Sequence, residues 1–171
     1  MPPLHRLPTR KAPWLLLAAS ALLLELCALY FQYVMGLEPC VLCVYERTAV
    51  AGILAGALIG ASAPHTVLAR LAGFTLWIGG AAWGLGLALE HMAIQAGGAS
   101  CDFLANYPDW FSLDRWLPWM FEPRGFCDEI QWTLFGYSMP QTLVPIYALY
   151  LGIAAIILLS RLRWHWRSRH A

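Results

Sequence analysis

Four long apolar runs constrain the fold of this chain more than any other feature of its sequence. A helix needs about 20 apolar residues to cross the ~30 Å hydrocarbon layer of a membrane. Hydrophobic residues make up 60% of the chain and charged residues 12%, about half the charged share of a typical soluble domain. We therefore predict an all-α integral membrane protein, with residues 1–171 forming a single domain built on a four-transmembrane-helix bundle. The expected spans are residues 14–34, 40–61, 71–91 and 142–160.

The basic residues predict the orientation of the bundle, because Lys and Arg collect on the cytoplasmic side of membrane proteins. Two of the connections, residues 35–39 and 92–141, together carry only Arg115 and Arg124. We therefore expect both termini inside and the long loop 92–141 outside. A nucleic-acid partner is not expected, because the basic tail is short and follows a membrane span directly. The basic residues on the expected inner side are Arg6, Arg10, Lys11, Arg70, Arg161, Arg163, Arg167 and Arg169.

The long outer loop contains an amphipathic stretch, PDWFSLDRWLPWMF, at residues 108–121. Its large apolar side chains recur near one helical face, which predicts a short helix lying in the membrane surface and broken near Pro118. Two interpretations stay open. The stretch is either a simple aromatic anchor, or an anchor that also keeps the flanking cysteines close to the membrane edge. The apolar residues of this face are Trp110, Leu113, Trp116, Leu117 and Met120.

Five cysteines raise the question of redox chemistry. Cys27 falls within the first span, where a cysteine most simply acts as a small buried hydrophobe. The other four are expected on the outer side, where thiols pair in an oxidising compartment; the pairings within each segment are Cys40–Cys43 and Cys101–Cys127. Two structural staples or a four-cysteine zinc site are the alternatives. A staple is the weaker explanation for Cys40–Cys43, because a disulfide across so short a loop constrains the unfolded chain very little.

The stretch EPCVLCVYER places this Cys-x-x-Cys pair at the start of the second span. Pro39 suits the first turn of a helix, so we expect Cys40 and Cys43 in the opening turns, where the helix dipole favours thiolate over thiol. Arg47 lies four residues after Cys43 and shares its stripe of the helix. Its charge either reaches the headgroups or pairs with a nearby glutamate, or it stabilises negative charge on a molecule bound beside Cys43.

Four further polar residues lie in or beside the spans. Glu46 is a possible partner of Arg47, and Glu90 and His91 end the third span at the same outer level. All three are therefore candidates for lining a binding site next to Cys43. Glu25 lies near the middle of the first span, where we expect a polar contact inside the bundle rather than chemistry.

These residues together resemble a known family. PCVLCVYER opens the second span, EH closes the third, and CDF and FCDEIQW lie in the long loop. In this order and topology they are similar to the bacterial disulfide bond formation protein B (DsbB) family. The resemblance extends from about residue 13 to residue 160.

The resemblance implies a quinone-dependent thiol oxidase, a multi-pass protein of the bacterial inner membrane with its active cysteines on the periplasmic side. It would reoxidise a DsbA-like periplasmic protein of the thioredoxin fold and so support disulfide bond formation in the periplasm. Cys101 would form the mixed disulfide with this partner, and Cys127 would then engage Cys40. Cys43 and Arg47 would lie beside a quinone, either ubiquinone or menaquinone, from the membrane pool.

Two functions of other kinds compete with this one. A small membrane transporter or a structural bundle would carry the cysteines as passive disulfides, and transport would require polar residues along a path through several spans. Here the polar residues other than Glu25 cluster at the outer edge. A thiol reductase that sends electrons outward would need a donor site on the inner side, and the connections expected there contain no cysteine.

Overall fold

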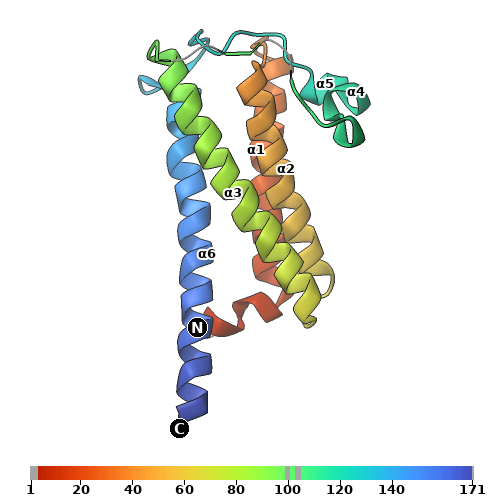
Figure 1. Cartoon of the computed structure of the whole chain (residues 1–171), viewed down its shortest axis with the longest axis vertical. Helices are drawn as coiled ribbons and strands as arrows, with labels where there is room; N and C mark the ends of the chain where they lie inside the picture. The colour runs from red at the N-terminus through yellow and green to blue at the C-terminus, as the bar shows by residue number, and fades with distance from the viewer. Residues whose placement is uncertain (1–3, 99–100, 103–104, 171) are drawn as a thin grey trace.

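The protein is dominated by long helices, as its apolar runs predict. The computed structural model describes residues 4–98, 101–102 and 105–170. Four of its helices are long and apolar enough to cross a membrane, so the expected all-α bundle of four candidate membrane helices is confirmed (Figure 1). These helices are α1 Lys11–Tyr33, α2 Val41–Ser62, α3 Val67–Gln95 and α6 Met139–His170.

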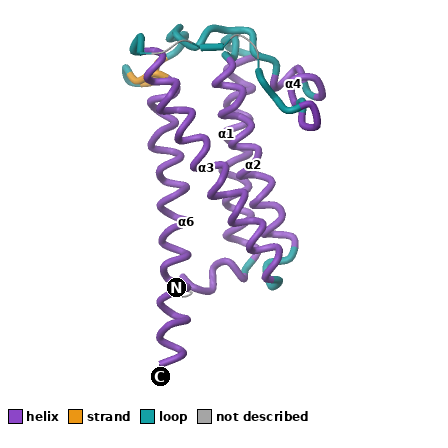
Figure 2. Tube along the Cα trace, viewed as in Figure 1, coloured by secondary structure: helices purple, strands orange, loops and turns teal. Residues whose placement is uncertain are grey.

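The connections between the long helices gather mostly at one end of the bundle. Residues 34–40 join α1 to α2 there, and the long connection between α3 and α6 covers the same end (Figure 2). We call this the loop end. The N-terminal 3-10 helix η1, Leu4–Thr9, lies toward the opposite end, and α6 extends past the other helices to the C-terminus (Figure 1).

Within the described residues, the long connection contains only short elements. Two antiparallel strands meet through a tight turn in which Gly136 has a positive φ of 87°. The helix predicted within residues 108–121 is present as two single turns. The break falls at Leu117, directly before Pro118, as expected from a proline that lacks a backbone N–H. The elements in order are η2 Asp109–Phe111, α4 Leu113–Trp116, α5 Pro118–Phe121, β1 Thr133–Leu134 and β2 Tyr137–Ser138.

The long helices pack through glycines where α2 meets α3 and through buried aromatic side chains in the core. α2 packs against both α1 and α3, and α6 packs against α3. A methyl group added at Gly56 would lie 2.7 Å from the carbonyl oxygen of Gly73, so α2 and α3 approach to backbone contact. The buried ring of Trp14 fills the space next to this contact. The core also holds Trp77 and Tyr147 and reaches toward the loop end.

Two helix ends differ from the expected boundaries in ways that affect the site. α2 begins at Val41, so Cys40 is its N-cap residue rather than part of the first turn. α3 continues to Gln95, so Glu90 and His91 lie within the helix, about a turn before its end. The apolar residues Met92, Ala93 and Ile94 extend the helix, and hydropathy alone did not separate them from the loop. α6 likewise continues through the basic tail, because Leu, Arg and Trp are all compatible with helix.

Candidate redox site at the loop end

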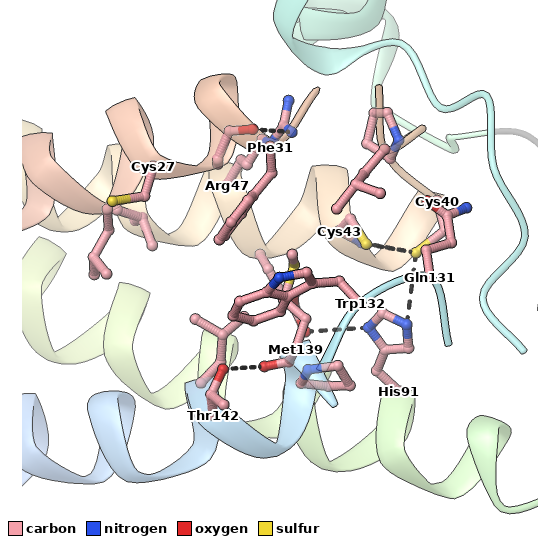
Figure 3. Close-up of a pocket in the computed structure, with 18 of the residues that line it drawn as sticks. Cys27, Phe31, Cys40, Cys43, Arg47, His91, Gln131, Trp132, Met139 and Thr142 are labelled. Carbon is pink, nitrogen blue, oxygen red and sulfur yellow. Dashed lines mark hydrogen bonds and ion pairs between the residues drawn. The ribbon is translucent and has the colours of Figure 1, made fainter. Parts of the chain in front are cut away.

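A pocket of about 190 Å³ opens at the loop end of the bundle. Its walls come from α1, α2, α3 and α6 and from the segment after Cys127, so residues distant in sequence meet around it (Figure 3). The ring centroids of Phe31 and Trp132 lie 4.8 Å apart on one side. Most of the lining is apolar, and Cys43 and Arg47 contribute polar groups to it. The pocket can therefore hold a flat apolar molecule against a polar wall.

The Cys40–Cys43 pair forms part of that wall. Cys40 caps the N-terminus of α2, and its sulfur accepts a hydrogen bond from the backbone N–H of Cys43 at 3.3 Å. The two Sγ atoms lie 2.8 Å apart as free thiols (Figure 3). The hydrogen bond from the Cys43 thiol lowers the pKa of Cys40. Thiolates are the nucleophilic form of cysteine, so this end of α2 is suited to thiol–disulfide exchange.

The second pair, Cys101–Cys127, is a disulfide in the structure, with Cα atoms 6.0 Å apart. Cys127 is only 1% exposed and packs in the same apolar cluster as Cys40, whereas Cys101 is half-buried at the edge of that cluster. Backbone hydrogen bonds tie the two segments together: the N–H groups of Arg124 and Gly125 both donate to the carbonyl of Pro39, at 2.8 and 3.0 Å. The alternative of a four-cysteine zinc site does not hold in this structure, because Cys101 and Cys127 are bonded to each other.

Arg47 is buried beside the pocket, on the same side of α2 as Cys43. Its guanidinium donates to Gln32 Oε1 at 2.5 Å, to the carbonyl of Met120 at 2.9 Å and to the carbonyl of Ala28 at 3.1 Å. The guanidinium neither reaches the surface nor pairs with a glutamate. Arg47 is buried, and no carboxylate lies within ion-pair distance of it among the described residues. Arg47 therefore places a fixed positive charge at the pocket and links α1, α2 and α5.

His91 and Glu46 form a buried pair behind the thiols. His91 Nε2 lies 3.7 Å from the sulfur of Cys40, and His91 Nδ1 lies 3.5 Å from Glu46 Oε1 (Figure 3). Both residues are less than 5% exposed. The structure thus brings both residues to the predicted place, although Glu46 faces His91 rather than Arg47. The order Cys40, His91, Glu46 is that of a thiol, an imidazole and an orienting carboxylate.

Three other predicted positions differ from expectation. Glu90 is exposed on α3 and does not line the pocket, because it lies one residue, about 100° of helix rotation, from His91. Cys27 is not buried: it is exposed on α1 at the rim of the pocket. The expected polar contact of Glu25 is not found, since neither carboxylate oxygen has a hydrogen-bond partner among the described residues, although the side chain is buried and lines the pocket.

Two residues of the site, Gln32 and Trp132, were not predicted from the sequence. Gln32 orients Arg47, and its signal was an isolated polar residue in the last turn of an otherwise apolar span. Trp132 covers the pocket from the loop. It was visible within the motif FCDEIQW, but nothing in a loop sequence shows which aromatic residue folds back onto the helices.

The chain is similar to a known protein family and to several curated proteins. The profile of the family described as "Disulfide bond formation protein DsbB" matches residues 10–157. Curated relatives named "Disulfide bond formation protein B" include that of Psychromonas ingrahamii, 53% identical over 86% of this chain and 81% of the relative. The relative from Aeromonas hydrophila is 45% identical over 93% and 94% of the two chains. The relative from Yersinia pestis is 47% identical over 92% and 91%.

The fold and the site define a multi-pass helical protein with two neighbouring cysteine pairs and an apolar pocket at one end of its bundle. Within that class, the chain belongs to the disulfide bond formation protein B (DsbB) family, as its motifs predicted. The expected resemblance is therefore confirmed. Membership implies a role in disulfide bond formation and thiol oxidoreductase chemistry.

Proposed function

We propose that this protein reoxidises a DsbA-like periplasmic protein of the thioredoxin fold and passes the electrons to a membrane quinone, either ubiquinone or menaquinone. The protein would lie in the bacterial inner membrane with its loop end on the periplasmic side. The observation that carries the proposal is the meeting of three features. Cys127 packs with Cys40, the segments before these cysteines are hydrogen-bonded, and Cys43 lines an apolar pocket.

The loop pair is the part suited to a soluble partner. A partner thiolate attacks the half-buried Cys101, the Cys101–Cys127 bond breaks, and the electron pair leaves on Cys127. The partner's second cysteine, as a thiolate, then attacks the partner sulfur that is bonded to Cys101. This closes the partner's disulfide and releases Cys101 as a thiolate. The partner gains a disulfide, and the loop pair becomes a dithiol that has taken two electrons.

The internal step returns the loop pair to its oxidised form. Cys127, as a thiolate, attacks Cys40 of an oxidised Cys40–Cys43 pair, and the electron pair leaves on Cys43 at the pocket wall. Cys101 then displaces Cys40, which remakes the loop disulfide and leaves Cys40–Cys43 as a dithiol. His91 is placed to accept the proton of Cys40, and Glu46 orients the imidazole.

The residues around the pocket fit a quinone. Phe31 and Trp132 offer flat apolar faces. The carboxyl of buried Glu25 has no hydrogen-bond partner among the described residues, and in its protonated form it would donate to a quinone carbonyl oxygen. Arg47 supplies a charge that a guanidinium retains even when buried. When bound, a quinone would supply the acceptor for the two electrons released as Cys40–Cys43 closes to a disulfide. Arg47 stabilises the thiolate of Cys43 during this step, and the apolar walls exclude water. Exposed Glu90 has no part in this site.

The relay can be tested by removing its internal resolving thiol. In Cys127→Ser, Cys101 is a free thiolate that attacks the disulfide of the oxidised partner, and no Cys127 remains to displace the partner from Cys101, so we expect a covalent adduct with the partner on non-reducing gels. Cys101→Ser should give no adduct. Adducts that instead require Cys40 would contradict the proposed order. A structural bundle or transporter with passive disulfides would form none.

A further inference from the structure

The wall of the pocket presents a set of metal ligands as well as a redox pair. Cys40 Sγ, Cys43 Sγ and one His91 ring nitrogen all lie within 4.8 Å of one another. The three side chains are buried or half-buried and line the same pocket. Two thiolates and an imidazole are the ligands that Zn²⁺ prefers, usually in a tetrahedral arrangement. We propose that the reduced protein binds one Zn²⁺ ion through Cys40, Cys43 and His91.

The distances agree with this coordination. Zn–S bonds of about 2.3 Å and Zn–N bonds of about 2.0–2.1 Å at tetrahedral angles place sulfur and nitrogen about 3.6 Å apart. Cys40 Sγ and His91 Nε2 are 3.7 Å apart. The same geometry requires the two sulfurs about 3.8 Å apart, whereas they lie 2.8 Å apart as thiols. Cys43 is only half-buried and borders the pocket, so a small rotation of its side chain toward the pocket supplies the missing separation.

Glu46 lies beside the ring nitrogen of His91 that would not bind the metal. A histidine that binds a metal through one nitrogen commonly donates the other N–H to a carboxylate, which fixes the tautomer and raises the basicity of the ligand. Here Nδ1 of His91 faces Glu46 Oε1 at 3.5 Å, and neither atom has a hydrogen-bond partner elsewhere among the described residues. The pair therefore leaves Nε2, which lies 3.7 Å from Cys40 Sγ, as the nitrogen for the metal.

Charge and access also favour the ion. Binding releases one proton from each thiol, so two thiolates neutralise Zn²⁺ and no net charge is introduced into an apolar pocket. The fourth position of the metal faces the pocket, where water or a small ligand completes the tetrahedron. Oxidation of Cys40 and Cys43 to a disulfide removes two of the three ligands. Zinc binding is therefore confined to the reduced protein, and, under the proposed function, zinc holds the site in the form that awaits its electron acceptor.

The test uses the full-length chain in detergent, reduced, under anaerobic conditions and without quinone or partner. A background with Cys101→Ser and Cys127→Ser removes the loop thiols. Titration with Co²⁺ should give thiolate-to-cobalt charge-transfer absorption that saturates at one ion per chain, and Zn²⁺ should displace it. Oxidation of Cys40 and Cys43 should abolish binding. Glu46→Gln should weaken Zn²⁺ binding about 10- to 100-fold, and His91→Ala should weaken it further.

Cys27→Ser is the matched control, because Cys27 borders the same pocket but is not among the three ligands; its affinity for Zn²⁺ should be unchanged. Zn²⁺ should also slow alkylation of Cys43 in the unsubstituted chain, a measurement that needs no folded variant. Binding that survives His91→Ala unchanged, binding by the oxidised pair, or unaltered alkylation would each overturn the proposal. None of these outcomes bears on electron transfer to quinone, so the two proposals fail separately.

Discussion

At the scale of single residues, Arg47 joins the fold of the site to its chemistry. Its hydrogen bonds to Gln32, Ala28 and Met120 connect α1, α2 and α5. The same guanidinium places a positive charge at the pocket that Cys43 lines. A substitution at this position therefore has to separate the effect of the charge from the effect of the hydrogen bonds.

Replacing Arg47 with Met keeps most of the volume and removes the charge. The lost charge-assisted contact is worth roughly 1.5–3 kcal/mol, so we expect quinone-dependent oxidation of Cys40–Cys43 to slow about ten- to a hundredfold. Exchange between the partner and Cys101–Cys127 takes place in the loop and should change little. Stopped-flow measurements of the two half-reactions give both rates.

Arg47→Lys is the control, since it keeps the charge and loses the planar fork of donors. If charge at the pocket is what matters, Lys should recover part of the quinone-dependent rate that Met loses. Collapse of thiol exchange in Arg47→Met, with the quinone-dependent step intact, would instead assign Arg47 to the support of the loop.

The relative placement of some side chains at the site was predictable from the sequence, and that of others was not. Cys43 and Arg47 were placed together correctly, because a spacing of four residues on a helix fixes their common side. The direction of Glu46 was not predictable in the same way. It depends on how α2 and α3 are rotated against each other, which brings His91 to within 3.5 Å of Glu46. Nothing within either helix alone records that rotation.

At the scale of elements, close contact between α2 and α3 determines which side chains meet at the pocket. Gly56 faces the backbone of Gly73, and Gly80 faces that of Ala49, so two separate points along the pair lack room for even a methyl group. The pairing of Glu46 with His91 lies further along this same interface. The register of α2 against α3 is therefore coupled to the geometry of the thiol site.

Gly56→Ala tests this coupling. The added Cβ would lie 2.7 Å from Gly73 O and 2.8 Å from the Cβ of Leu76, and overpacking of this kind costs about 1–3 kcal/mol. We expect a lower free energy of unfolding in mixed detergent micelles, measured by circular dichroism. Gly52→Ala on the same helix is the matched control, because a methyl group there meets nothing within 4 Å. Equal stability of the two variants would show that the interface is looser than described.

Helix existence was predictable at this scale, and helix ends were less so. Apolar length identified all four long helices. The extra turns of α3 and the continuation of α6 were not predicted, because residues such as Met92 and Trp164 are compatible with both a helix and a membrane-surface loop. The break at Pro118 was predictable, since the missing N–H of proline acts locally.

At the scale of the whole molecule, the cysteine site, the pocket and the aromatic loop lie at one end, and the termini lie toward the other (Figure 1). The distribution of basic residues predicts that the loop end faces the periplasm. The relay requires this orientation, because the proposed partner is a periplasmic protein and disulfides persist in that compartment.

Fusions to alkaline phosphatase test the orientation, since the enzyme is active only where its own disulfides form. A fusion after Gly98 should be active, because this position lies at the loop end. A fusion after Arg163, in the basic part of α6, should be inactive. The reverse pattern of activities would place the cysteines on the cytoplasmic side and remove the basis for the proposed partner.

In the proposed relay, electrons pass from a thioredoxin-fold dithiol through Cys43 to a quinone. The most direct test combines the purified protein, a reduced periplasmic thioredoxin-fold partner and a soluble ubiquinone analogue, and follows quinone absorbance and partner thiols together. The proposed electron route predicts that one quinone is consumed for each partner disulfide formed, because each conversion transfers two electrons. It also predicts that Cys43→Ser abolishes quinone consumption and limits partner oxidation to the one equivalent held by Cys101–Cys127. Quinone consumption without partner oxidation, or undiminished turnover in Cys43→Ser, would contradict it.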